Sequence, residues 1–150
     1  MIYIGCDHGG FELKNSIIAH LTENGADVVD CGTYTTDSVD YPDIANEVCD
    51  KVLAQRGVGI LVCGTGVGMS IAANKRKGIR AALCGDTFSA RMTRMHNDSN
   101  ILCLGQRVTG FGLANDIVDA FLNAEFEGGR HERRVNKINE IESLWLSFGA

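Results

Sequence analysis

Short apolar runs alternate with longer stretches of helical period along this chain. The short runs are typical of strands buried on both faces, and the longer stretches repeat apolar residues every three or four positions. Strands are predicted at 1–6, 26–29, 59–63, 79–84 and 100–104, and helices near 11–21, 42–56, 69–74, 88–95, 113–122 and 135–145. This alternation predicts an α/β fold with a doubly wound parallel five-stranded sheet, helices on both faces in three layers, and a C-terminal helix.

Length and composition narrow the possible classes. The chain has 150 residues, so we expect a single domain over 1–150. Its net charge of -5 gives no broad basic surface for nucleic acid. No apolar run approaches the roughly 20 residues of a membrane span, and the N-terminus does not resemble a signal peptide. The six cysteines contain no C-x-x-C pair, which fits buried thiols in the cytoplasm.

The predicted sheet places several reactive residues at one edge. In open α/β sheets, ligands bind beyond the C-terminal ends of the strands. The segments expected there are Cys6-Asp7-His8-Gly9-Gly10, Cys63-Gly64-Thr65-Gly66-Val67-Gly68 and Cys84-Gly85-Asp86. We therefore expect the functional site at this edge.

The glycine-rich segment after Cys63 allows two interpretations. Its backbone amides could hold a phosphate or a developing oxyanion, or the glycines could serve only a tight strand-to-helix turn. It lacks the Gly-Lys-Ser/Thr ending of a P-loop, and Met69 replaces the third glycine of a dinucleotide fingerprint. Cys63 itself could be an activated base or nucleophile, or one more buried cysteine.

Two histidine segments are also ambiguous when taken alone. Asp7 and His8 could move protons at a strand end, or Asp7 could simply cap a helix. His96 could be an acid/base group, or a favourable charge at a helix C-terminus. A metal site made of Asp7, His8 and His96 has no supporting ligand spacing, so we expect no metal.

A basic cluster opens the last predicted helix. Arg130 and Arg134 are four residues apart and share a helix face, as two groups that bind a phosphate monoester would. The alternative is a solvated basic turn matched by neighbouring acids. Arg107, after the fifth predicted strand, is a third candidate for an anion contact.

Together these motifs resemble the B-type ribose-5-phosphate isomerases and the related galactose-6-phosphate isomerase subunits, over essentially the whole chain. The resemblance is carried by five segments: Gly5-Cys6-Asp7-His8-Gly9-Gly10-Phe11, Asp40-Tyr41-Pro42, Cys63 through Lys75, His96-Asn97-Asp98-Ser99-Asn100 and Glu127-Gly128-Gly129-Arg130-His131. It implies a Rossmann-like domain, no cofactor, and a homodimer or tetramer whose sites are shared between subunits.

The resemblance also implies roles at the matching positions. Cys63 is similar to the base that moves a proton between C1 and C2, and Thr65 to its partner at the hydroxyl. The loop residues Gly64, Gly66, Val67 and Gly68 would offer amides to the enediolate. His96, aided by Asp7, resembles the group that opens the sugar ring. The remaining substrate contacts implied are His8, Tyr41, Asn97, Arg107, Arg130 and Arg134.

The expected substrate is therefore a phosphorylated sugar, with ribose 5-phosphate first. Allose 6-phosphate and galactose 6-phosphate are alternatives, because they differ from it by one hydroxymethylene. A non-catalytic phosphate-binding module would need the loop and the arginines but neither Cys63 nor His96. A metal-dependent isomerase, which moves a hydride, would lose its activity to a chelator.

Overall fold

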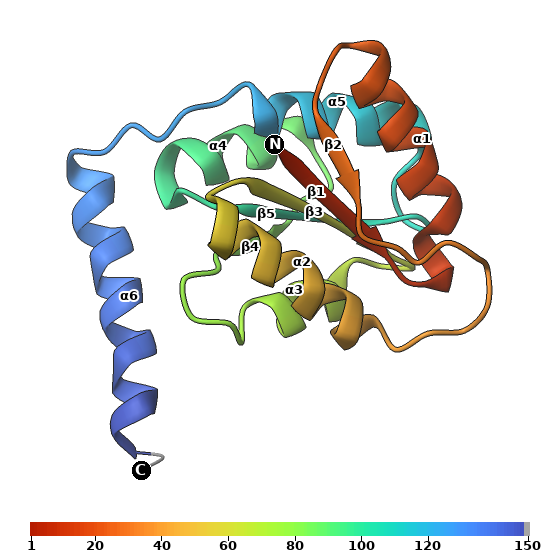
Figure 1. The fold of residues 1–150 in the computed structure, drawn as a ribbon. Helices are drawn as coiled ribbons and strands as arrows, with labels where there is room; N and C mark the ends of the chain where they lie inside the picture. The colour runs from red at the N-terminus through yellow and green to blue at the C-terminus, as the bar shows by residue number, and fades with distance from the viewer. Residues whose placement is uncertain (149–150) are drawn as a thin grey trace.

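A five-stranded parallel sheet in the order β2-β1-β3-β5-β4 forms the centre of the computed structural model (Figure 1). The model describes residues 1–148, with the side chains of 145–147 left out. The strands are β1 (Ile2–Cys6), β2 (Val28–Asp30), β3 (Val58–Cys63), β4 (Ala81–Leu83) and β5 (Ile101–Gly105). The helices are α1 (Phe11–Glu23), α2 (Tyr41–Gln55), α3 (Val67–Ala73), α4 (Thr87–Asn97), α5 (Phe111–Leu122) and α6 (Arg130–Phe148), with a 3-10 turn η1 at His8–Gly10. The predicted α/β class is confirmed.

Strand β4 is shorter than the sequence pattern predicts. The amide of Ile79 bonds to the carbonyl of Arg76 at 3.1 Å, and Gly78 has a φ of 84°. Ile79 therefore ends a turn, although its side chain is buried as a strand residue's would be. Burial alone produced the apolar run that suggested a strand starting at this residue.

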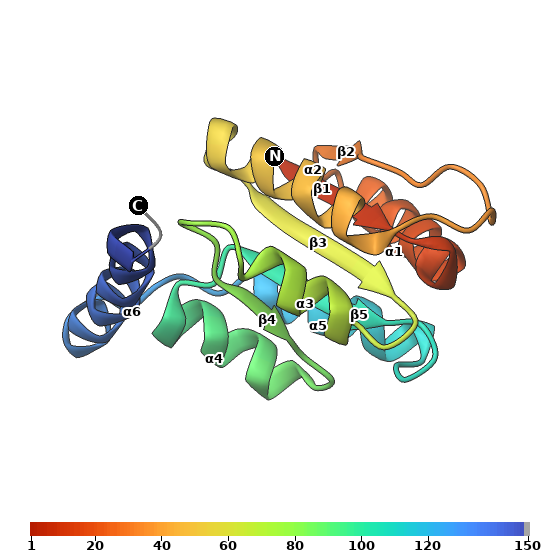
Figure 2. The same ribbon diagram turned by 90° about the horizontal axis from the view of Figure 1, so that it is seen from below.

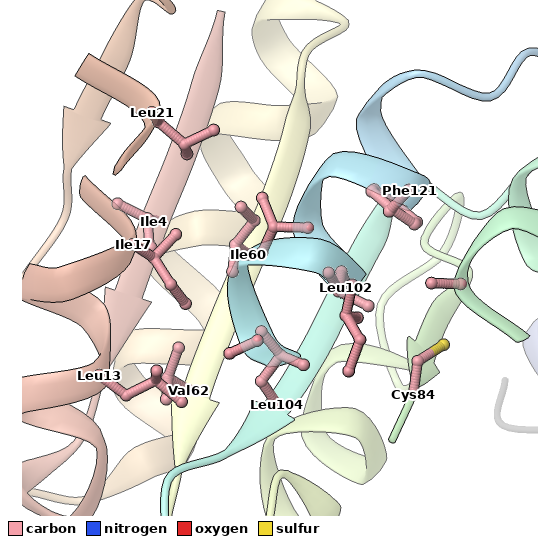
Figure 3. Packing of buried hydrophobic residues seen from close by; sticks show 14 of the residues in the cluster. Ile4, Leu13, Ile17, Leu21, Ile60, Val62, Cys84, Leu102, Leu104 and Phe121 are labelled. Atoms are coloured by element: carbon pink, nitrogen blue, oxygen red, sulfur yellow. The ribbon is translucent and has the colours of Figure 1, made fainter. Parts of the chain in front are cut away.

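Side chains alternate between the two faces of the sheet, as expected for strands buried on both sides. One core lies beneath α1, α4 and α5, and Figure 3 shows part of it. Its central strand residues are Ile4, Ile60, Val62, Leu102 and Leu104. The other core lies beneath α2 and α3 and includes Leu61, Cys63, Ile101 and Cys103.

Helix α6 stands beside this body and does not cover the sheet (Figures 1 and 2). Its first apolar residue, Val135, is buried, but Ile138, Ile141 and Leu144 are 41%, 58% and 56% exposed. The Glu142 carboxylate accepts the Gly78 amide at 3.1 Å and ties the helix to the body. None of the described helices is long and apolar enough to cross a membrane.

Candidate active site

The C-terminal ends of β1, β3 and β5 lie side by side. Cys6 pairs with Val62, and Cys63 pairs with Gly105. The loops that follow these strands therefore meet at one edge, as the topology predicts. The predicted site residues that these three loops carry are Asp7, His8, Cys63, Gly64, Thr65, Gly66, Val67, Gly68 and Arg107.

Glycines let these loops touch through their backbones. A Cβ on Gly105 would lie 2.5 Å from the Thr65 carbonyl carbon, and one on Gly10 would lie 2.6 Å from the Val62 oxygen. Gly66 has a φ of 78°, which favours glycine. At Gly64, by contrast, a Cβ would meet only the Arg107 side chain, at 3.6 Å. Most of these glycines thus serve packing, and Gly64 also leaves its backbone open beside a guanidinium group.

Cys63 ends β3 inside this edge. Its side chain is buried, and its Sγ accepts the Gly66 amide at 3.0 Å. An N–H donor at this position stabilises negative charge on the sulfur. Thr65 is exposed next to it, and its Oγ1 accepts the Val67 amide at 3.3 Å. A nucleophilic atom, a hydroxyl and loop amides thus share one small region.

The other five cysteines are free, buried thiols. Desolvation by burial raises the pKa of Cys6, Cys49 and Cys84 to about 11 in each case. Burial also raises the pKa of Cys31 and Cys103. These residues match the sequence-based interpretation of most cysteines as small buried hydrophobes.

Asp7 and His8 are held in different ways. The buried Asp7 carboxylate accepts the Gly9 amide at 2.8 Å, so it does cap the η1 turn. His8 is exposed, and its Nδ1 accepts the Val39 amide at 3.3 Å. This bond leaves Nε2 of the neutral His8 ring as a hydrogen-bond donor. Tyr41 lies against the start of α3, since a Cβ on Gly68 would sit 2.9 Å from its ring.

Lys14, to which the sequence assigned no role, stabilises the loops at the same edge of the sheet. It is fully buried, and its Nζ lies 2.7 Å from both the Asp30 carboxylate and the Thr33 carbonyl. The Thr33 amide in turn bonds to the Cys6 carbonyl at 2.8 Å. The lysine therefore fixes the loop that leads from β2 to Tyr41. Lys14 shares the buried face of α1 with Ile17 and Leu21. Its role depends on partners that lie in a later segment of the chain, at Asp30 and Thr33, which is why the sequence did not reveal it.

The remaining predicted site residues lie at the opposite end of the sheet. Helix α4 runs back against the strand direction, so His96 and Asn97 end beside the start of β5. Arg130 and Arg134 open α6 at that same end. Figure 2 shows β3 pointing away from α6 and from the end of α4. Within one chain, these four residues do not meet Cys63.

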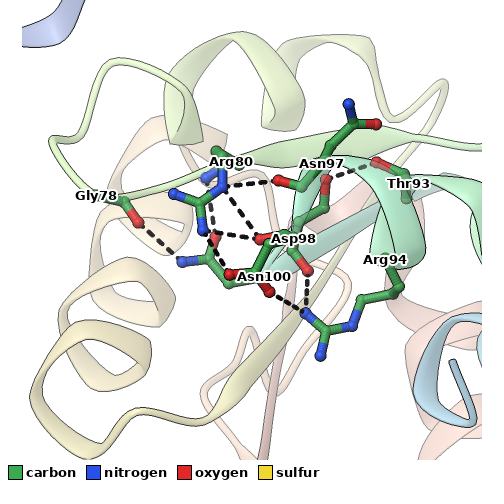
Figure 4. Close-up of polar contacts among 8 residues, drawn as sticks. Gly78, Arg80, Thr93, Arg94, Asn97, Asp98 and Asn100 are labelled. Carbon is green, nitrogen blue, oxygen red and sulfur yellow. Dashed lines mark hydrogen bonds and ion pairs between the residues drawn. The ribbon is translucent and has the colours of Figure 1, made fainter. Parts of the chain in front are cut away.

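A polar network fixes the last turn of α4 (Figure 4). The Arg80 guanidinium donates to the carbonyls of Asn97 and Asp98 at 2.9 Å each. The Arg94 guanidinium donates to the Ser99 carbonyl at 2.6 Å. The side chain of Asn97 points away from this network (Figure 4) and is free to reach a ligand.

His96 is stacked on His131, with ring centroids 4.1 Å apart and planes inclined by 8°. Glu127 lies beside both rings. Arg130 and Arg134 have no carboxylate partner among the described residues, so their guanidinium groups are available to bind an anion. Asp7 and His8 lie at the other end from His96, so the metal set considered from the sequence does not form within the chain.

Comparisons with known proteins place this chain among sugar phosphate isomerases. The model of the family described as Ribose/Galactose Isomerase matches residues 2–138. Ribose-5-phosphate isomerase B of Escherichia coli is 53% identical over 142 residues, covering 94% of this chain and 95% of that protein. A putative sugar phosphate isomerase of Bacillus subtilis is 50% identical over 143 residues, with 94% and 96% covered.

Solved structures are equally similar. Ribose-5-phosphate isomerase B of Clostridium thermocellum matches with a TM-score of 0.94 and 54% identity, over 96% of this chain and 98% of that chain. The enzyme of the same name from Thermotoga maritima matches with a TM-score of 0.91 and 53% identity, over 93% and 97%.

Proposed function

Because the chain belongs to the ribose/galactose isomerase family, we propose that it interconverts ribose 5-phosphate and ribulose 5-phosphate. It is an aldose-ketose isomerase, in keeping with the high identity to ribose-5-phosphate isomerases B along nearly the whole chain. The observation that carries the proposed chemistry is the Cys63 sulfur, held by a loop amide beside the Thr65 hydroxyl.

In the proposed reaction, the Cys63 thiolate removes the proton from C2 of the open-chain aldose and returns it to C1. The enediolate formed between these steps lies against the amides of 64–68, and Thr65 handles the hydroxyl proton. No step requires a cofactor or a metal. The loop amides are already positioned by backbone packing, so little reorganisation is needed as charge develops.

Ring opening and phosphate binding need both ends of the molecule. We assign ring opening to His96 with Asp7, and a substrate contact to Asn97. Phosphate binding falls to His8, Arg107, Arg130 and Arg134. Because one chain holds these groups at opposite ends of its sheet, a complete site takes Cys63 from one subunit and His96 from another. The proposed assembly is therefore a homodimer, alone or paired into a tetramer.

Helix α6 supports this assembly. Its exposed Ile138 and Ile141 line a groove of about 760 Å³ against β4 and the end of α4. A second copy of the chain is the proposed occupant, since it would cover the apolar face and deliver the missing half of the site. Sedimentation velocity should show a dimer or tetramer that Ile141→Glu converts to monomers, with Asn136→Glu as the matched exposed control. A monomeric wild-type protein would contradict the assembly.

The activity is tested by assaying the protein with ribose 5-phosphate in deuterated water with EDTA present. We expect turnover with deuterium entering the product, and its loss in Cys63→Ala. Turnover that survives in Cys63→Ala would assign the base elsewhere, and turnover abolished by EDTA would indicate a metal-dependent hydride shift. The family name also covers galactose enzymes, so allose 6-phosphate and galactose 6-phosphate are assayed in parallel. Binding of all three sugars without turnover would leave a phosphate-binding module.

Free thiols at all six cysteines fit a reducing compartment. The cytoplasm is accordingly the proposed location.

A further inference from the structure

Three metal-ligating side chains gather where α4 ends and α6 begins. The Nε2 atoms of His96 and His131 lie 3.9 Å and 3.3 Å from the same oxygen, Oε2 of Glu127. The three potential ligand atoms all lie within 4.8 Å of one another. Neither Glu127 nor His131 has a part in the proposed isomerisation.

The backbone builds this cluster from three separate segments. The Glu127 amide bonds to the Met95 carbonyl at 3.0 Å, which fixes the linker before α6 against the last turn of α4. Gly128 and Gly129, with φ of 65° and 55°, then reverse the chain. The reversal places His131, which is only 9% exposed, over the ring of His96. The carboxylate and both imidazoles are thus held before any ligand binds.

We propose that His96, Glu127 and His131 form a binding site for a divalent transition metal ion, with Zn²⁺ as the best match. Two imidazoles and one carboxylate are a known zinc ligand set that leaves a fourth position open. Tetrahedral bonds of about 2.0–2.2 Å separate ligand atoms by roughly 3.4 Å, close to the two distances measured from Glu127 Oε2. The nearly parallel rings must splay for both lone pairs to converge, and His96, with 37% of its side chain exposed, has room to turn.

Occupation of this site would stop the isomerase. A metal ion on Nε2 of His96 takes the lone pair with which that ring accepts a proton during ring opening. Zn²⁺ is therefore an inhibitor here and has no catalytic part. The inhibition rests on the proposed function, whereas the binding of zinc does not, so the two can be measured separately.

Calorimetric titration of the metal-free protein with zinc chloride tests the site. We expect one Zn²⁺ per chain, with affinity lowered about tenfold or more in Glu127→Gln and in His131→Gln. Glu125→Gln is the matched control, because it removes the same charge from the same exposed linker. Cys63→Ser removes the competing thiol and should leave zinc binding intact. Circular dichroism establishes whether each variant is folded. If the buried His131→Gln variant does not fold, Glu127→Gln still tests the site, because the Glu127 side chain is exposed.

Inhibition of ribose 5-phosphate turnover is measured beside binding, each variant being compared with its own metal-free rate. Zinc should inhibit the wild type reversibly with EDTA, and Glu127→Gln should need about tenfold more. The assignment is overturned if zinc does not bind, if binding is lost in Cys63→Ser, or if both cluster variants bind as the wild type does. Binding without any effect on turnover overturns the inhibition. A protein that binds zinc as expected but turns over no sugar phosphate would refute only the proposed isomerase activity.

Discussion

The two ends of the sheet differ in how many of their contacts a single chain supplies. At the C-terminal end, three loops are locked together through backbone contacts at Gly10 and Gly105, and Cys63 is held from within. At the other end, His96 sits on the last turn of a helix beside α6, whose apolar face is open. The first end is built within one chain, whereas in the proposed dimer the second is completed by a neighbour. Under that proposal, assembly and chemistry depend on each other.

The strongest test of this comparison mixes two inactive variants. Cys63→Ala and His96→Ala should each lose about 10² to 10⁴ of kcat, as expected when a general acid or base is removed. After the two are unfolded and refolded together, half of the dimers contain both chains, and each of these has one intact site. About a quarter of the wild-type activity should return. No recovery on mixing would mean that each site lies within one chain.

A smaller effect is expected from filling the contact that locks the C-terminal end of the sheet. In Gly105→Ala, the new methyl group meets the backbone of Thr65 at 2.5 Å, so the loop must move. We expect kcat to fall about 10²-fold, since a misplacement near 1 Å has that effect. Gly112→Ala, where nothing lies within 4 Å, should instead stabilise α5 by up to about 1 kcal/mol. Unchanged kcat in Gly105→Ala would show that the loop tolerates displacement.

Lys14→Met tests the support beneath that same end. The change leaves the Asp30 carboxylate without its buried partner, and we expect the free energy of unfolding to fall by about 3 kcal/mol. Lys51→Met is the matched control, because its pair with Glu47 at 3.7 Å is exposed and should contribute less than about 0.5 kcal/mol. Urea denaturation measures both. Equal losses would mean that burial gives Lys14 no special weight.

The smallest effect separates Cys63 from the other thiols. Burial raises the pKa of Cys84 from 9.0 to about 11, so at pH 8 this thiol is protonated and shielded. Iodoacetamide should therefore label Cys63 first, as peptide mass spectrometry can show. First labelling at Cys84 would contradict this expectation.

The raised pKa of Cys6, Cys49 and Cys84 also makes the stability of the fold depend on pH. The contribution of these thiols to the free energy of unfolding is fully present below pH 9 and is lost between pH 9 and 11. The midpoint of urea denaturation should therefore fall as the pH is raised from 9 to 11.

Much of the fold could be predicted from the sequence, because buried parallel strands leave continuous apolar runs. Ile2–Cys6 and Val58–Cys63 agree with the predicted strands to within a residue. Ile79 is an exception, because it is buried as a turn residue and so lengthens the apolar run beyond the strand. The strand order was not readable from the pattern, because β5 pairs between β3 and β4 only through contacts distant in the chain.

The candidate site was predictable to a smaller extent. Residues at strand ends, such as Asp7, Cys63 and Thr65, were expected at one edge because topology alone places them there. Their catalytic roles rest on the family resemblance and stay predictions. Lys14 and His131 were given no role because their importance arises from contacts with Asp30 and His96, residues distant in the chain.

The separation of the half-sites along the sheet has a kinetic consequence. If the active site is shared between two chains, the activity per milligram of protein depends on the protein concentration. Below the dissociation constant of the dimer, the reaction velocity would rise with the square of the total chain concentration, and above it only linearly. A newly made subunit would be inactive until it bound a second one. The association that buries Ile138 and Ile141 would also complete the active site. Dilution would act on this enzyme as a reversible off-switch.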